Sequence, residues 1–326
     1  MLVASKKRID MPSKYYLGID TSNYTTSVSL VDADREVVLN CKRLLPVKEG
    51  ECGLRQSDAL FAHTKALPIL LNEMADTLGD GQILAVGVSE KPRNVEGSYM
   101  PCFLAGVSAA TAAACALNAP LYTFSHQCGH LMAAIYSAKA QNVFLNGEPF
   151  VAFHLSGGTT EMLSVQYTNN AFVCEIIGAT ADISAGQLLD RIGVEMGLNF
   201  PCGAQIEQLA LKCEQKIPKT SIKSADGKIN LSGYENKIKQ IYSQTNDKSF
   251  VARYVLSVVL EAIKAMISSI PQHLQGAPVL FSGGVMSCSY LKTELSKICN
   301  GYFSVPAFSS DNAAGIALLT SYKYQN

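Results

Sequence analysis

Three side chains in this sequence are of the types that hold a divalent metal ion. His126 and His130 stand four positions apart at the start of a helix-like segment, and Asp311 lies near the far end of the chain. Residues four apart on a helix project from one face, so one cation can accept both imidazoles. A carboxylate from a distant loop would complete three protein ligands and leave positions open for substrate. Two histidines also reach this spacing by chance, so the motif depends on its context.

Two strand hairpins are predicted around this motif. The apolar run 15–20 ends in a polar turn, and 25–31 alternates as a second strand; 150–155 and 161–166 repeat the pattern later in the chain. Helical spacing of apolar residues marks 58–76, 188–197 and 254–269 as helices. Alternating strands and helices predict an α/β protein, and the repeated hairpin predicts two related halves.

Glycine pairs follow two of the predicted strands. Gly157 and Gly158 form the turn of the second hairpin, and Gly283 and Gly284 follow strand 279–282 and precede a helix. Paired glycines let the backbone approach a ligand and turn its N–H groups towards an anion. Each pair also fits an ordinary turn. Together with the hairpins they favour a duplicated architecture that cradles a nucleotide.

Composition limits the class of protein. A chain of 326 residues with 48% hydrophobic content exceeds the usual size of one domain, so two lobes are expected. With 27 basic and 27 acidic residues the chain has no overall charge that would attract nucleic acid. The ten cysteines, unpaired in spacing, suggest buried thiols in the cytoplasm. The Ala-rich stretch 100–121 is interpreted as a buried helix, so no membrane association is expected.

The predicted organisation is a frayed tail at 1–13, an N-terminal lobe at 14–124 joined by a C-terminal helix at 312–326, and a C-terminal lobe at 125–311. The last of these carries a basic insertion at 212–248, in which eight lysines face four acidic residues for a local charge of +4. This insertion is either a solvated helical segment or a surface for the phosphate backbone of a nucleic acid such as tRNA.

Six motifs in this order resemble those of the universal tRNA threonylcarbamoyladenosine synthase family, also called O-sialoglycoprotein endopeptidase-like proteins. The resemblance extends from about residue 15 to 320, which is nearly the whole chain. The motifs are Leu-Gly-Ile-Asp20-Thr21-Ser22, His126-Gln-Cys-Gly-His130, Leu155-Ser156-Gly157-Gly158-Thr, Asp182-Ile-Ser-Ala-Gly-Gln-Leu-Leu-Asp190, Ser-Gly283-Gly284-Val and Ser-Asp311-Asn312-Ala.

The resemblance implies a two-lobed actin-like ATPase fold, as in sugar kinases, Hsp70 and actin, with duplicated α/β lobes. It implies one iron or zinc ion held by His126, His130 and Asp311, and ATP or threonylcarbamoyl-AMP as the nucleotide ligand. In the family this adenylate donates its carbamoyl group to adenosine 37 of tRNA, with the help of accessory tRNA-modification proteins. A metal ion and glycine amides suit this reaction, because both stabilise negative charge on the leaving phosphate.

The resemblance also assigns residues to the nucleotide. Asp20, Thr21 and Ser22 would form the first phosphate loop. The remaining substrate-binding residues are His154, Leu155, Ser156, Gly157 and Gly158 at the carbamoyl and phosphate end, Asp190 and Gly203 at the nucleoside, and Gly283, Gly284 and Cys288 in the last turn. Asp190 suits the ribose, because a carboxylate accepts hydrogen bonds from hydroxyls. Its alternative role is a surface pair with Arg191.

The chain departs from the family pattern at several of these positions. Tyr24 and Thr25 replace two acidic residues of the first turn, Thr159 replaces a histidine, Cys202 a glycine and Cys288 an asparagine. A thiol cannot offer the paired donor and acceptor of an amide. Because the metal ligands remain while the phosphate loop and nucleoside pocket differ, the pattern is that of a divergent paralogue.

Three functions follow from this pattern. The first is a metal-dependent threonylcarbamoyl transferase acting on tRNA, and the second is a carbamoyl transferase with a small-molecule or other acceptor. The third is a non-catalytic actin-like scaffold, which has no need of three convergent ligands. A zinc protease is disfavoured, because Gln127 stands where such an enzyme places its glutamate base.

Overall fold

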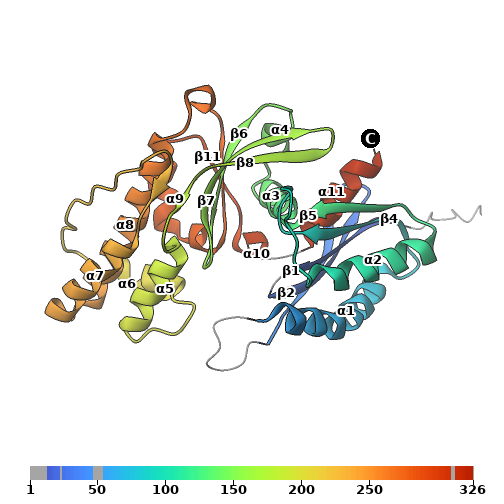
Figure 1. Cartoon of the computed structure of the whole chain (residues 1–326), viewed down its shortest axis with the longest axis horizontal. Helices are drawn as coiled ribbons and strands as arrows, with labels where there is room; N and C mark the ends of the chain where they lie inside the picture. Colours follow the sequence, from blue (N-terminus) through green and yellow to red (C-terminus); the bar gives the residue numbers. More distant parts are fainter. Residues whose placement is uncertain (1–12, 23, 47–53, 310–312, 326) are drawn as a thin grey trace, which may run out of the picture. The chain divides into compact units, whose positions relative to one another are not determined.

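The computed structural model describes residues 13–22, 24–46, 54–309 and 313–325 (Figure 1). By their contacts, these residues form two compact units. The first contains the described residues up to 132 together with those from 313 onward, and the second contains 133–309. The division falls within the helix α3 (His126–Ser137), so one continuous helix carries the chain from the first unit into the second.

The first unit is built on a five-stranded sheet in the order β3-β2-β1-β4-β5. Neighbours β1, β2 and β3 are antiparallel, whereas β1, β4 and β5 are parallel. The predicted hairpin 15–31 is confirmed, because β1 and β2 pair from Tyr15–Asp32 to Ser22–Thr25. The strands are β1 (Lys14–Ser22), β2 (Thr25–Asp32), β3 (Val37–Leu44), β4 (Gln82–Lys91) and β5 (Leu121–Ser125).

Helices cover both faces of this sheet (Figure 1). The helices α1 (Gln56–Leu78) and α2 (Phe103–Leu117) pack on one face, and α11 (Ala314–Gln325) packs on β1, β2 and β4. The strand and α11 approach so closely that a Cβ atom on Gly18 would lie 2.5 Å from the backbone nitrogen of Ala317. Glycine is therefore required where α11 crosses β1. The predicted helix at 58–76 is confirmed as α1.

The second unit repeats this strand order. Its sheet runs β11-β10-β6-β7-β8-β9, with an antiparallel meander of β6, β7 and β8 and with β10 parallel to β6. Hairpin β6–β7 corresponds to β1–β2, and β10 takes the place of β4, so the predicted duplication is confirmed. The strands are β6 (Phe150–Leu155), β7 (Thr160–Thr168), β8 (Ala171–Thr180), β9 (Lys228–Ile229), β10 (Val279–Ser282) and β11 (Gly301–Phe303).

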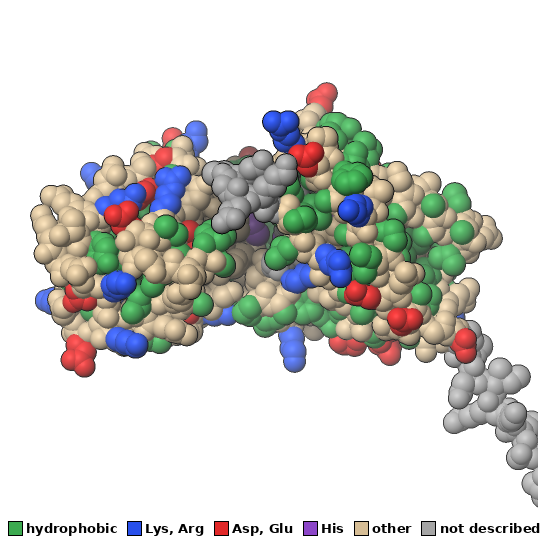
Figure 2. Space-filling model, turned by 90° about the horizontal axis from the view of Figure 1, so that it is seen from below, with side chains coloured by type: hydrophobic (Ala, Val, Ile, Leu, Met, Phe, Trp, Pro, Cys, Tyr) green, Lys and Arg blue, Asp and Glu red, His purple; other side chains and the backbone are tan. Residues whose placement is uncertain are grey.

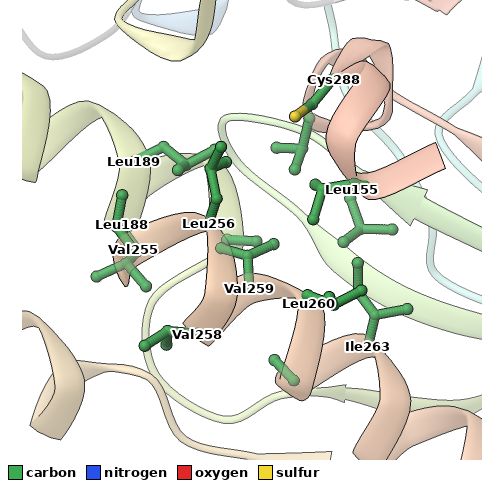
Figure 3. Packing of buried hydrophobic residues seen from close by; sticks show 14 of the residues in the cluster. Leu155, Leu188, Leu189, Val255, Leu256, Val258, Val259, Leu260, Ile263 and Cys288 are labelled. Atoms are coloured by element: carbon green, nitrogen blue, oxygen red, sulfur yellow. The ribbon is translucent and has the colours of Figure 1, made fainter. Parts of the chain in front are cut away.

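The core of the second unit is organised around α8. Figure 3 shows Val255, Leu256 and Val259 of α8 among Leu188 and Leu189 of α5. All are at most 4% exposed, and their removal from water is the main source of stability here. The helical segments are α4 (Gln141–Phe144), α5 (Ala185–Glu195), α6 (Gly203–Ala210), α7 (Ser232–Thr245), α8 (Lys248–Ser268), η1 (Gln272–Leu274), η2 (Gly284–Ser287), α9 (Ser289–Leu295) and α10 (Pro306–Ser309).

The basic segment 212–248 contains β9, α7 and stretches without regular structure. Elsewhere, basic and acidic side chains are interspersed over the face seen in Figure 2, as equal counts would suggest. Within the described ranges, no helix combines the length and apolar character needed to cross a membrane. The Ala-rich stretch 100–121 instead forms α2, which packs on β4 and β1 and leads into β5.

Candidate functional site

The structure brings His126 and His130 together on one face of α3, about one turn apart at its N-terminus. Their ring centroids are 4.3 Å apart in an edge-to-face arrangement. The helix begins directly after β5, so the end of this edge strand, which pairs with β4, fixes the place of both imidazoles. This is the same-face geometry that four-residue spacing on a helix produces.

A buried carboxylate contacts the first of these histidines. Asp20 Oδ1, near the end of β1, lies 3.0 Å from His126 Nδ1. Asp20 is fully buried and the His126 side chain is 19% exposed. Ser22 Oγ donates to Asp20 Oδ2 at 2.8 Å, and Ser89 Oγ on β4 donates to Asp20 Oδ1. The carboxylate is therefore held by groups from β1, β4 and α3.

These histidines suit a divalent ion. Two adjacent imidazoles supply nitrogen ligands of the kind that zinc and iron accept. A carboxylate at the Nδ1 side of a histidine leaves the Nε2 side for the metal, which is a common arrangement in metalloproteins. Among the described residues, no three His, Cys, Asp or Glu side chains form a group able to hold a metal. The third predicted ligand, Asp311, lies outside the described residues.

The side chains of the predicted first phosphate loop are engaged inside the fold. Thr21 is fully buried and its hydroxyl donates to Cys102 O at 3.2 Å, while Ser22 is 3% exposed and bonded to Asp20. The Thr21 hydroxyl thus joins β1 to the start of α2, and the Ser22 hydroxyl bonds within β1. The assignment of this loop to phosphate stays a prediction, and these three side chains already have partners of their own.

The second unit contains the two glycine turns. The Gly157, Gly158 and Gly284 backbones face open space, since a Cβ at any of them would meet no atom within 4 Å. Gly283 differs, with φ at 95° and a position for Cβ only 2.1 Å from Leu155 O. The turn after β10 therefore lies directly on the end of β6. Open, side-chain-free backbone is what close approach of a phosphate requires.

His154 and Ser282 lie at neighbouring positions at the ends of β6 and β10. His154 Nδ1 is 3.2 Å from Ser282 Oγ, which donates to Phe153 O at 3.1 Å. Next to them, Leu155 is fully buried, and the Ser156 N–H donates to Thr159 O at 2.8 Å to close the glycine turn. His154 and Gly157 are thus placed by the same strand end.

The predicted nucleoside residues have structural roles as well. Asp190 Oδ1 accepts the Cys202 N–H at 2.8 Å, which ties α5 to the start of α6 beside Gly203. Cys288 is 8% exposed, and burial raises the pKa of its thiol to about 11. Burial therefore favours the uncharged thiol of Cys288 at neutral pH.

Two residues beside Asp20 were missed by the sequence analysis. Ser89 lies within the apolar strand β4, and His63 lies on the buried face of α1, where its Nδ1 is 2.8 Å from Thr26 Oγ1. A histidine or serine in an apolar pattern usually signals only a core residue. The one available signal was a polar residue at a position where the helical or strand periodicity demands an apolar one.

His63 predicts a dependence of stability on pH. Burial lowers its pKa from 6.5 to about 4, opposed by the nearby Asp20 charge. Between these values the unfolded chain binds more protons than the folded one, so the free energy of unfolding falls as pH drops from 6.5 towards 4. The loss is ~3 kcal/mol at most. Urea unfolding at several pH values should show a shallower fall in His63→Asn, and parallel curves for the two proteins would contradict the prediction.

Comparison with solved structures identifies the class of fold. Component A of (R)-2-hydroxyglutaryl-CoA dehydratase from Acidaminococcus fermentans aligns with a TM-score of 0.56 at 14% identity, covering 96% of this chain and 99% of that one. Full-length HypF aligns with a TM-score of 0.57 at 13% identity, over 98% of this chain and 56% of that one. Together with the duplicated sheets, these define an actin-like ATPase fold, as predicted.

Comparison of sequences identifies the family. Residues 53–318 match the model of the tRNA N6-adenosine threonylcarbamoyltransferase family, and the chain belongs to that family. Proteins of that name from Campylobacter hominis and Carboxydothermus hydrogenoformans are 28% and 27% identical. The alignments cover 94% and 95% of this chain and 92% of each relative. The resemblance read from the six motifs is confirmed.

Proposed function

We propose that this protein is a metal-dependent transferase that passes a threonylcarbamoyl group from threonylcarbamoyl-adenylate to the N6 nitrogen of adenosine 37 in tRNA. The observation that carries the proposal is the family match over 53–318, with relatives named for this reaction along nearly their whole length. Relatives named for a tRNA acceptor favour tRNA over a small molecule. The paired histidines beside a buried carboxylate favour an enzyme over a scaffold.

In the proposed reaction the N6 amine forms a bond to the carbamoyl carbon and releases one proton to solvent, while the bond from that carbon to the phosphate oxygen breaks and AMP leaves. His126, His130 and Asp311 would hold one iron or zinc ion, which supplies Lewis-acid stabilisation of negative charge. The open backbone of Gly157, Gly158 and Gly284 supports binding of the adenylate phosphate.

The basic segment 212–248 supports contact with tRNA. Lys212, Lys216, Lys219 and Lys223 are exposed. By contrast, Glu235 is 7% exposed and already paired with Arg191 and Lys239 at 3.1 and 2.7 Å. Because Glu235 is neutralised by Lys239 of the same segment, seven lysines remain against three acidic residues, and the local charge stays at +4. We propose that phosphates of the tRNA lie here, with accessory tRNA-modification proteins completing the assembly.

The test is complementation. Expression of this chain in cells depleted of their ordinary synthase is expected to restore threonylcarbamoyl-adenosine in total tRNA, measured by mass spectrometry of nucleosides. The His126→Ala variant serves as a matched control for indirect effects and should not restore it. If the wild-type chain is expressed and folded but the modified nucleoside stays absent, tRNA is not its acceptor in that assembly.

A further inference from the structure

Asp20 has a place in the fold that does not suit direct contact with a nucleotide. It lies on β1, between β2 and β4 in the sheet and two residues before the strand ends at Ser22, and its side chain has no exposed surface. Burying a carboxylate is costly unless hydrogen bonds or an opposite charge compensate it. The hydrogen-bond donors around the Asp20 carboxylate therefore indicate which side chain it orients.

The hydrogen bonds of Asp20 determine which nitrogen of His126 carries the proton. An ionised carboxylate can only accept, so each atom bonded to it must donate. Ser89 and Ser22 donate to its two oxygens, and His126 Nδ1 lies 3.0 Å from Oδ1. The proton of a neutral His126 then lies on Nδ1, and Nε2 carries the lone pair that a metal requires.

The support of Asp20 is rigid. Ser89 lies on β4, which is paired in parallel with β1, and both Asp20 and Ser89 are fully buried. His126 is the first residue of α3, directly after β5, which pairs with β4. Two neighbouring strands and a helix start thus fix both the carboxylate and the imidazole, as positioning of a metal ligand requires.

We propose that Asp20 is a positioning residue for the metal site: it holds His126 in the Nδ1-protonated tautomer and in the orientation that presents Nε2 to the ion. This assigns Asp20 to the metal centre instead of the phosphate loop. The inference rests on the proposed role of His126 and His130 as ligands.

The test is the affinity of the purified full chain for Zn²⁺, measured by competition with a chromophoric chelator. The Asp20→Asn variant keeps the size of the side chain but can donate to His126 Nδ1 and so favour the wrong tautomer. We expect its Zn²⁺ affinity to fall by about 10- to 100-fold, as for other partners of metal-bound histidines. The absorption spectrum of Co²⁺ bound in its place should change as well, which lost stability alone would not cause.

Asp182→Asn is the matched control. Asp182 accepts backbone N–H groups of Leu231 and Ser232 in the second unit, so its loss should lower stability and leave Zn²⁺ affinity unchanged. If Asp20→Asn does not fold, Ser89→Ala is the second variant, because it removes one donor to the carboxylate; a several-fold loss of affinity is expected. Wild-type affinity in a folded Asp20→Asn, or failing that in Ser89→Ala, overturns the inference.

The two proposals fail in different ways. If the wild-type chain and His130→Ala bind Zn²⁺ equally, the histidine pair is not the metal site, and the role of Asp20 is overturned with it. If His130→Ala loses binding while Asp20→Asn retains it and gives an unchanged Co²⁺ spectrum, the metal site stands and only the positioning role of Asp20 is wrong.

Discussion

Replacing His126 with alanine is expected to remove the bound metal ion and to abolish transfer to tRNA. The substitution deletes one of the two imidazoles that stand 4.3 Å apart and also leaves Asp20 without its His126 contact. Loss of a direct ligand should cost more than the ~10- to 100-fold typical of a residue that only orients one. Freshly purified wild type should contain about one metal ion per chain by elemental analysis, and His126→Ala close to none.

The matched control is His273→Ala. His273 lies in η1 of the second unit and is exposed, so the same change of residue should leave metal content and activity as they are. Loss of metal in both variants would indicate nonspecific binding through histidines. Wild-type protein that is purified without metal and binds none on addition would contradict the proposed site.

The hairpins and the main helices were predictable because their signals are local, whereas the actin-like fold was implied by the resemblance of the motifs. Each hairpin is encoded by two short apolar runs and a polar or glycine turn, and the order β3-β2-β1-β4-β5 recurs as β8-β7-β6-β10-β11. The spacing of His126 and His130 likewise needs only one helical turn to bring the rings together. Patterns that span a few residues can be read without knowledge of the tertiary structure.

The proposed role of Asp20 in positioning His126 depends on distant residues and was not predictable from the sequence. Ser89 is 69 positions away and His126 is 106 positions away, and only the pairing of β1 with β4 and the start of α3 bring them together. From its motif alone, Asp20 resembled a residue of a phosphate loop. His63 was missed for the same reason, since its partner Thr26 lies on a strand 37 positions earlier.

A substitution in the glycine turn after β10 is expected to cause a large loss of stability. Gly283→Ala should destabilise the protein by about 3 to 5 kcal/mol, because two costs combine. The backbone at φ 95° and ψ 162° lies in a region that only glycine adopts readily. In addition, the new Cβ would lie 2.1 Å from Leu155 O, and a strand backbone cannot move aside without separating β10 from β6. Thermal unfolding should report a much lower midpoint.

Gly284→Ala, at the position next to Gly283, is expected to weaken ligand binding without lowering the stability of the protein. Its backbone has no positive φ, and a Cβ there would meet no atom within 4 Å, so the midpoint should change little. The methyl group would nevertheless project from backbone that the proposed phosphate must approach closely. We expect a folded protein that adenylate no longer stabilises against heat, whereas adenylate raises the midpoint of the wild type by mass action. Equal stabilisation of Gly284→Ala and wild type would mean that this turn does not contact the nucleotide.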